Sequence, residues 1–300
     1  MRSISLLRKQ KYIDMSIIQI DGFKVYENYD GTRSIIIDSE NIKQCMDCYY
    51  KNKLDGVALT NYHGYNLKDV DFLSRYTDIT KLSVPETILD ITGMYSLSKL
   101  ERLIISGKKR KIDFSFFPNL KKLTLDWSDS LINLDQCKSL ESLAIYSGYN
   151  PKSKDLKDIS SVHWLKKIEI NNSTITSFKG SEKFDSLVEL DFNYCTKLED
   201  ICGFEKSKKK LKSLLFNHCK SIKNHECVTD FKNLDILAFN NSGTIRSLQF
   251  IKELSSLNSF RFVGTDVLDG DITPCIGLNY VSFTNKKHFT HKMEELKSKK

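Results

Sequence analysis

The feature that most constrains this chain is a short apolar pattern that returns along most of its length. The pattern is Leu-x-x-Leu-x-Leu, with Ile, Val or Phe replacing some leucines, and it occurs eleven times. Successive copies begin 20 to 25 residues apart. One unit of this size cannot bury its apolar face alone, so the pattern predicts a stack of units that share one continuous core. The triplets are Leu54/Val57/Leu59, Ile79/Leu82/Val84, Leu100/Leu103/Ile105, Leu120/Leu123/Leu125, Leu140/Leu143/Ile145, Leu165/Ile168/Ile170, Leu187/Leu190/Phe192, Leu211/Leu214/Phe216, Leu234/Leu237/Phe239, Leu257/Phe260/Phe262 and Leu278/Val281/Phe283.

This repeat resembles the leucine-rich repeat family, whose units contain about 20–29 residues and one short strand each. An aliphatic-x-Asp-Ile pattern at 88–91, 156–159 and 198–201 is similar to the internalin-like subclass of about 22 residues per repeat. The resemblance covers about residues 54–285. It implies an α/β leucine-rich repeat solenoid of about eleven repeats, with a curved parallel β-sheet and short 3₁₀ or extended segments on the convex side.

Side-chain alternation divides each predicted strand into two faces. The fourth and sixth positions of a unit point into the core, and the third, fifth and seventh point outward. The sixth position is Phe in the last five units, which predicts a stacked phenylalanine spine. The family's ninth position is usually Asn or Cys, and here the resemblance places Cys195 and Cys219 there, with Ser or Thr in several other units. We therefore expect an irregular ladder of hydrogen bonds at this position.

The residues outside the repeats are expected to close the two ends of the stack. We divide the chain into a disordered extension (1–14), an N-terminal cap (15–53), the repeats (54–285) and a C-terminal cap with a tail (286–300). No room remains for a separate catalytic domain.

Local patterns predict the structure of each cap. Strand patterns at 16–20, 23–28 and 33–37 are joined by Asp-Gly turns, which makes the N-terminal cap a β-hairpin followed by a helix. We expect Ser39 to begin that helix, over about 40–51, with its apolar face on the first repeat. Phe289, Met293 and Leu296 fall on one helical face and are expected to close the last repeat.

Composition and charge favour a cytoplasmic protein with reduced thiols. The net charge is +8, with both signs mixed along the chain, so nucleic-acid binding is not required. No apolar run reaches the roughly 20 residues that a bilayer needs, so we expect no membrane segment. The basic N-terminus has an apolar stretch shorter than the roughly 7–15 residues of a signal peptide, and translation could start at Met1 or Met15. Eight cysteines in a chain of this length without an export signal are expected to be reduced.

Two groups of cysteine and histidine residues invite a chemical interpretation. Cys45 and Cys48 form a Cys-x-x-Cys pair, but without a surrounding βαβ pattern or a second pair we interpret them as core residues rather than a redox or zinc site. The group Cys195, Cys202, His218, Cys219, His225 and Cys227 could hold a metal, but ladder packing is favoured.

No phosphate-binding loop, dinucleotide fingerprint or HExxH motif is present. We expect no catalytic residues, no metal and no cofactor, and the chain is interpreted as a non-enzyme.

Outward strand positions supply the candidate partner-binding residues. Lys81, Arg102, Lys122 and Lys167 form a basic stripe at the third position, with Tyr146 as an aromatic anchor, and Glu169 and Asp191 form an acidic zone. Four asparagines at the seventh position of neighbouring units either face a partner or bond to one another along the stack. The lysine-rich run at 206–212 lacks interleaved aromatics, so a solvated loop is favoured over a nucleic-acid site.

These features predict a non-enzymatic protein-binding module that uses the concave face of the solenoid. We expect a monomer whose protein partner carries an acidic patch, with no membrane attachment. A cytosolic inhibitor, such as an immunity protein that neutralises a toxin, is the favoured role. The alternatives are a secreted effector or internalin-like adhesin and, in a different class, a nucleic-acid- or metal-binding protein.

Overall fold

The computed structural model describes residues 15–108 and 110–296, which pack into two compact units. The first unit contains the chain up to Leu125 together with Ser130–Ser139, and the second contains Asp126–Asp129 and the chain from Leu140 onward. The predicted extension (1–14) and most of the predicted tail (297–300) lie outside the described residues. None of the helices in the described ranges has the length and apolar character needed to cross a bilayer.

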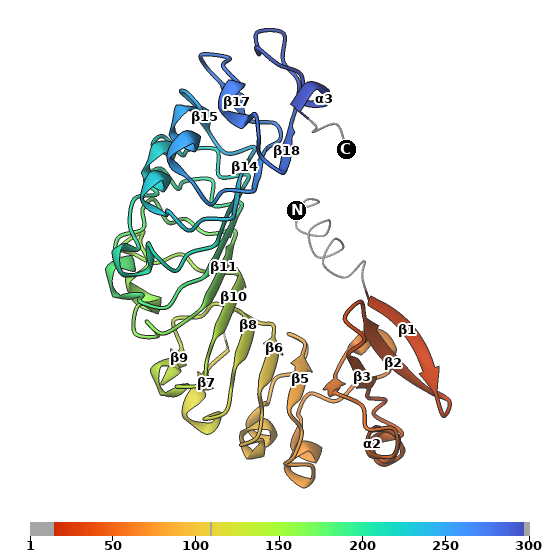
Figure 1. Cartoon of the computed structure of the whole chain (residues 1–300). Coiled ribbons are helices and arrows are strands. Elements are labelled where there is room, and N and C mark those ends of the chain that lie inside the picture. Colours follow the sequence, from red (N-terminus) through yellow and green to blue (C-terminus); the bar gives the residue numbers. More distant parts are fainter. Residues whose placement is uncertain (1–14, 109, 297–300) are drawn as a thin grey trace. The chain divides into compact units, whose positions relative to one another are not determined.

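Within the described ranges, the principal sheet has 14 strands and is mostly parallel (Figure 1). Strands β1 and β2 form an antiparallel hairpin, β2 pairs antiparallel with β3, and β3 begins the parallel part by pairing with β4. In the first unit the strands are β1 (Met15–Ile20), β2 (Phe23–Asn28), β3 (Arg33–Ile36), β4 (Gly56–Ala58), β5 (Lys81–Val84), β6 (Arg102–Ile105) and β8 (Lys122–Asp126). In the second they are β10 (Ser142–Ser147), β11 (Lys167–Asn171), β12 (Glu189–Asn193), β13 (Ser213–Asn217), β14 (Ile236–Asn240), β16 (Ser259–Phe262) and β18 (Tyr280–Phe283).

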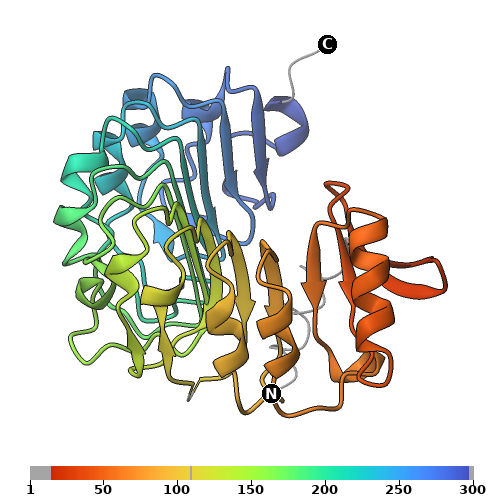
Figure 2. The same cartoon turned by 90° about the horizontal axis from the view of Figure 1, so that it is seen from below.

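Short 3₁₀ helices and turns return the chain from each strand to the next. Figures 1 and 2 show these connections on the side of each unit opposite its sheet. Two-stranded parallel pairs also form there, β7 (Ile112–Asp113) with β9 (Leu131–Ile132) and β15 (Thr244–Ile245) with β17 (Asp266–Val267). The 3₁₀ helices are η1 (Asn61–His63), η2 (Asp71–Arg75), η3 (Thr92–Ser96), η4 (Phe114–Phe116), η5 (Leu134–Gln136), η6 (Lys157–Ile159), η7 (Ser181–Lys183), η8 (Glu205–Ser207), η9 (His225–Asp230), η10 (Gln249–Glu253) and η11 (Thr273–Cys275).

The repeated triplets form the core of both units. Strands β5 and β6 alternate between half-buried outward and fully buried inward side chains, as the period of two requires. Every residue of the eleven triplets is buried except Leu278, which is half-buried in the last repeat. The leucine-rich repeat fold expected from the pattern is therefore the fold of the chain.

The predicted phenylalanine spine is present in the second unit. Phe192 and Phe216 stack with ring centroids 5.7 Å apart, and Phe216 and Phe239 stack at 5.2 Å with nearly parallel rings. Beyond them, Phe262 and Phe283 stack at 4.7 Å. Parallel strands hold equivalent residues in register, which brings these rings face to face inside the stack.

The N-terminal elements agree with the sequence pattern except at the start of the helix. Helix α2 (Ile42–Lys51) is preceded by Asn41, whose side chain makes no capping hydrogen bond. The predicted cap, Ser39, is not at the helix start, because its Oγ accepts a hydrogen bond from the Asn66 backbone N–H at 2.8 Å instead. Cys45 and Cys48 both lie on the buried side of α2, where burial raises the pKa of each thiol.

The C-terminal helix is shorter and more exposed than expected. Helix α3 (Met293–Leu296) has one turn, and none of its residues is buried. Phe289 does reach the spine, since its ring centroid lies 5.8 Å from that of Phe283. Polar contacts also fix this segment, since the Thr290 backbone N–H donates to the Gly270 carbonyl oxygen at 2.9 Å and Thr290 Oγ1 accepts from the Ile272 backbone N–H at 2.9 Å.

Ninth-position side chains form the hydrogen-bonded ladder of the second unit. Cys219 Sγ donates to the Phe192 carbonyl oxygen at 3.4 Å, and Ser242 Oγ donates to the Phe216 carbonyl oxygen at 3.1 Å. Cys195 Sγ lies 3.7 Å from the Ile170 carbonyl oxygen. Burial, and then a hydrogen bond with the Cys195 thiol, raises the pKa of Cys219. Both thiols therefore act as weak donors in the core, as the ladder interpretation predicts.

The expectation that all thiols are reduced is wrong for one pair. Cys202 and Cys227 form a disulfide whose Cα atoms lie 5.2 Å apart. They belong to neighbouring repeats and reach each other because consecutive turns stack on the side opposite the sheet. The other six cysteines are free and buried.

Lowering the pH is expected to destabilise the protein through one buried histidine. His225 is 2 % exposed, and its Nε2 donates to the Ser242 carbonyl oxygen at 2.7 Å. Burial lowers the pKa of His225 below its usual 6.5, although the hydrogen bond to Ser242 and the charge of Glu226 oppose the shift. The unfolded chain therefore takes up this proton first, and the contribution of His225 is present above about pH 6.5 and lost as the pH falls below it. Urea unfolding between pH 7.5 and 5 should show this loss, and a His225→Gln variant should show a shallower decline. An unchanged slope in the variant would contradict the assignment.

Candidate protein-binding surface

The outward side chains of the parallel strands form the candidate binding surface. Backbone hydrogen bonds between strands fix which residues are neighbours, so equivalent positions form rows across the sheet. The rows of the two units differ in charge.

The first unit presents three predicted cations in one row. Lys81 pairs in register with Arg102, and Arg102 with Lys122, on β5, β6 and β8. Lys81 is already neutralised, since its Nζ lies 3.1 Å from Asp55 Oδ1. Arg102 and Lys122 make no ion pair within residues 15–108 and 110–296. The structure thus brings two like charges together and leaves them available to a partner.

A carboxylate of the N-terminal hairpin is close enough to interact with this row. Two hydrogen bonds from Thr32, together with the more distant charges of Arg102 and Lys81, lower the pKa of Asp30. Asp30 lies in the exposed turn between β2 and β3. The turn therefore lies close enough for Asp30 to interact with the basic row. The single negative charge of Asp30 compensates only part of the positive charge of that row.

In the second unit, Lys167 belongs to an acidic cluster rather than to a basic stripe. Its Nζ lies 2.6 Å from Glu189 Oε2 on β12, the next strand. Glu169 and Asp191 occupy the adjacent row and are in register with each other. Burial alone would lower the pKa of Lys167, but its hydrogen bond to Glu189 and the charges of Glu169 and Asp191 outweigh burial and raise it. Three carboxylates around one ammonium group give this patch an acidic character.

Tyr146, the predicted aromatic anchor, lies near the end of β10. It is half-buried and occupies an outward position of the second unit. Its carbonyl oxygen accepts a hydrogen bond of 3.4 Å from Asn172 Nδ2. The residue stays a candidate anchor beside the acidic cluster.

Three of the four asparagines at the seventh position form a hydrogen-bonded file, whereas the fourth, Asn171, donates to Glu169 Oε1 at 3.0 Å instead. Asn240 Nδ2 donates to Asn217 Oδ1 at 2.9 Å, and Asn217 Nδ2 donates to Asn193 Oδ1 at 2.9 Å. Asn193 Nδ2 then donates to Asp191 Oδ1 at 2.8 Å. At the other end, the Val263 backbone N–H donates to Asn240 Oδ1 at 3.0 Å. Of the two possibilities left open by the sequence, this geometry shows the structural one.

Replacing the middle member of the file should cost measurable stability. We expect Asn217→Ala to lower the free energy of unfolding by roughly 1–2 kcal/mol, because two half-buried hydrogen bonds are lost. The matched control is Ser213→Ala on the same strand, whose side chain makes no hydrogen bond within the part of the chain that the structure describes. Urea unfolding of both variants checks the expectation. Equal losses for the two would show that the file contributes nothing.

A stacked pair at the edge of the sheet was not predicted from the sequence. Tyr194 and His218 follow β12 and β13, and their ring centroids lie 4.4 Å apart with nearly parallel planes. Both have left-handed backbone angles, with φ of 56° and 58°, which a bulky residue such as Tyr rarely adopts. The equivalent positions of the flanking repeats hold Asn172 and Asn241, which tolerate this conformation better. The replacement of Asn by Tyr194 and His218 in two successive repeats is the sequence signal that could have indicated this pair.

The lysine-rich run between β12 and β13 is partly neutralised. Lys208 Nζ lies 2.6 Å from Asp230 Oδ2, and Lys210 Nζ donates to the Asp185 carbonyl oxygen at 2.7 Å. These contacts use two of its cations to tie neighbouring repeats together. The arrangement favours a structural loop over a site that binds the phosphate backbone of a nucleic acid.

Comparison with known proteins gives a result for structure only. No protein-family model matches the sequence, and no curated protein matches it. Solved structures do match, including an internalin (InlF) of Listeria monocytogenes strain 4b F2365, with a TM-score of 0.52 and 16 % identity over 85 % of this chain and 83 % of that chain. The functional domain of InlJ from Listeria monocytogenes matches with a TM-score of 0.54 and 18 % identity over 86 % of this chain. The fold is that of an internalin-like leucine-rich repeat protein.

The sequence identity to these two structures is only 16–18 %, so the similarity is one of fold and assigns no role to individual residues of this chain. The chain spans 55 % of the length of the InlJ domain. That InlJ domain includes a cysteine ladder.

Proposed function

We propose that the chain is a non-enzymatic protein-binding module that uses the outward face of its sheet. The observation that carries this proposal is the pairing of Arg102 with Lys122, in register on neighbouring strands and without an ion pair among the described residues. Two like charges at this spacing repel each other, so the fold gains nothing from their placement. A rigid sheet also loses little conformational freedom when it binds a folded protein.

The partner of this surface carries an acidic patch. Opposite charges on the two surfaces accelerate association and disfavour wrong partners more than they raise affinity. Tyr146, Lys167, Glu169 and Asp191 in the second unit offer a patch of opposite sign for a second contact. Lys81 contributes to the field of the first unit, although Asp55 compensates its charge.

Within this class, a cytoplasmic inhibitor that neutralises a toxin, as an immunity protein does, is the role we favour. It requires a stable, pre-ordered surface and a monomer that meets its target in the cell. A secreted effector or adhesin is the alternative, and the Cys202–Cys227 disulfide favours it because disulfides persist in oxidising compartments.

Affinity capture tests the class of function. Tagged full-length protein is incubated with a lysate of the source cells, and bound material is analysed by mass spectrometry with and without nuclease treatment. We expect one or a few stoichiometric proteins that survive nuclease and elute as salt is raised, because the contact is charged. Nucleic acid as the retained species, or no specific protein at any salt concentration, would refute the proposal.

A further inference from the structure

A turn that begins with aspartate recurs on the side of the units opposite the sheet. Asp90 Oδ1 accepts from the Thr92 backbone N–H at 2.8 Å, and its side chain also binds the Thr92 hydroxyl at 2.7 Å. Asp113 binds Ser115 in the same way, at 3.0 and 2.7 Å. Where a following repeat supplies an asparagine, its amide joins the turn, since Asn133 Nδ2 donates to Asp113 Oδ1 at 2.9 Å. These two copies thus combine an aspartate with a hydroxyl residue two positions later, and the Asp113 copy adds an asparagine from the next repeat.

One copy of this turn carries thiols where the others do not. Asp200 Oδ1 accepts from the Cys202 backbone N–H at 3.0 Å and from Asn224 Nδ2 at 2.7 Å, which matches the turn built by Asp113 and Asn133. Cys202 takes the place of Ser115. Cys227 stands three residues after Asn224, where the other copy has Gln136 three residues after Asn133. Neither thiol is required by the turn.

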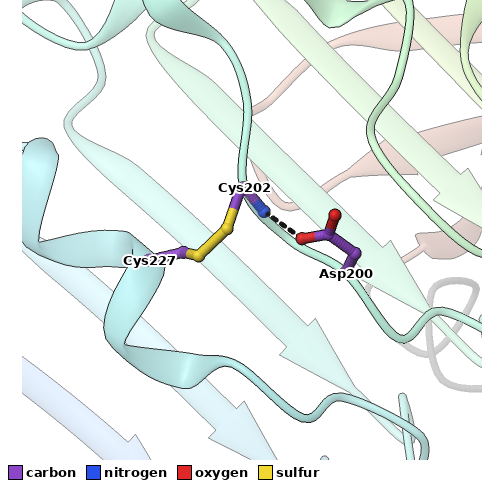
Figure 3. Close-up of side chains that lie close together, drawn as sticks. All are labelled: Asp200, Cys202 and Cys227. Atoms are coloured by element: carbon purple, nitrogen blue, oxygen red, sulfur yellow. Dashed lines mark hydrogen bonds between the residues drawn. A yellow bond between two sulfur atoms is a disulfide. The ribbon is translucent and has the colours of Figure 1, made fainter.

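These thiols and the carboxylate converge on one point (Figure 3). One ligand atom from each of Asp200, Cys202 and Cys227 lies within 4.8 Å of the other two. Asn224 Nδ2 lies among them, 3.1 Å from Cys202 Sγ and 3.2 Å from Cys227 Sγ. An amide has two N–H groups, so it cannot satisfy three acceptors at once. A cation held by these three donor atoms would take the place of this amide, so its binding requires the Asn224 side chain to turn aside.

We propose that the reduced pair binds one thiophilic divalent cation of the zinc class, with Asp200 as the third ligand. A thiol or phosphine reductant supplies two electrons to the Cys202–Cys227 bond, and two protons complete the two thiols. Binding of the cation then releases these two protons, because the thiolate is the ligand. Two thiolates and one carboxylate are ligands that Zn²⁺ accepts, and the fourth position is left to water.

Accessibility supports this assignment over the other thiols. Asp200 and Cys202 are exposed and Cys227 is half-buried, whereas the six free cysteines are buried. The neighbouring Lys223 is neutralised by Glu199, with Nζ and Oε2 2.6 Å apart, which reduces its repulsion of a bound cation. The site joins two consecutive repeats, so an ion there replaces the covalent link when that link is reduced.

Titration with Co²⁺ tests the proposal on the full-length protein. The protein is reduced with a phosphine without oxygen, and a thiol assay confirms that Cys202 and Cys227 are free. We expect one Co²⁺ per chain, with thiolate-to-cobalt charge transfer and the visible bands of a tetrahedral ion, both removed by added Zn²⁺. A reduced protein without these bands would overturn the proposal and leave the pair as a covalent link only.

Variants of the same turn locate the ion. Cys202→Ser and Cys227→Ser should abolish the charge-transfer band, and the first should fold because Ser115 occupies the equivalent position. Asp200→Asn should weaken Co²⁺ binding at least about tenfold. The matched control is Asp90→Asn, which lies in the same aliphatic-x-Asp-Ile pattern and forms the same turn but has no neighbouring cysteine, and it should leave binding unchanged. A band that persists in Cys202→Ser would place the ion on other thiols and refute the assignment.

Discussion

Phe239→Ala is expected to lower the free energy of unfolding by roughly 3–5 kcal/mol, the usual cost of removing a buried aromatic ring. Phe239 is 0 % exposed and stacks on Phe216 at 5.2 Å. The His225 and Phe239 rings form a T-shaped pair with their centroids 4.7 Å apart. Its removal leaves a cavity that the rigid stack cannot close, because backbone hydrogen bonds hold the strands on both sides. Urea unfolding followed by circular dichroism measures the loss.

Tyr280→Ala provides the control for the loss of an aromatic ring from the same sheet. Tyr280 lies on β18 and is 54 % exposed, so its removal should change the free energy of unfolding by no more than about 0.5 kcal/mol. A loss below about 1 kcal/mol for Phe239→Ala would contradict its place in the spine.

Arg102→Glu combined with Lys122→Glu is expected to abolish binding of the partner while the protein stays folded. The two side chains lie in register on β6 and β8, and the reversed charges would repel an acidic surface. Arginine is among the residues that most often dominate interface energies, so Arg102 should account for the larger share. Titration of the captured partner against both proteins measures the effect, and wild-type affinity should fall as salt rises.

The control changes the net charge equally at positions away from the sheet. Lys99 and Lys152 are exposed residues outside the strands, and Lys99→Glu with Lys152→Glu should retain binding. If the Arg102/Lys122 variant binds its partner normally, the basic row is only a solvated surface. The contact would then lie elsewhere, and the asparagine-rich strands of the second unit would be the next place to test.

The sequence predicts the fold well because each repeat restates the same constraint. A core position such as that of Leu82 or Phe216 must be apolar in every repeat, so its recurrence makes it recognisable in the sequence. The direction and register of the strands then follow from the stacking of the repeats. Leu278 is the exception, since it lies in the last unit and has no further repeat to cover it. Ser39 shows the complementary failure, because a local capping signal lost to a hydrogen bond with Asn66, 27 residues away.

The candidate surface is less predictable because it depends on partners that lie about one repeat apart. Nothing in the local sequence of Lys81 shows that Asp55 neutralises it, or that Lys167 pairs with Glu189. The link between Cys202 and Cys227 is of the same kind, because spacing alone could not distinguish it from ladder packing. Individual outward residues are therefore predictable in position, but their charge balance is not.

The asparagine file has a direction, and this has a consequence for how such a chain can lengthen. Each interior amide donates once and accepts once, and the file runs from the Val263 backbone N–H to the Asp191 carboxylate. A duplicated repeat that carried one asparagine at this position could be inserted into the middle of the file without disturbing the hydrogen bonds at either end of the file. Gene duplication could thus extend this part of the molecule one amide at a time, whereas loss of Asp191 would remove the acceptor at which the row stops.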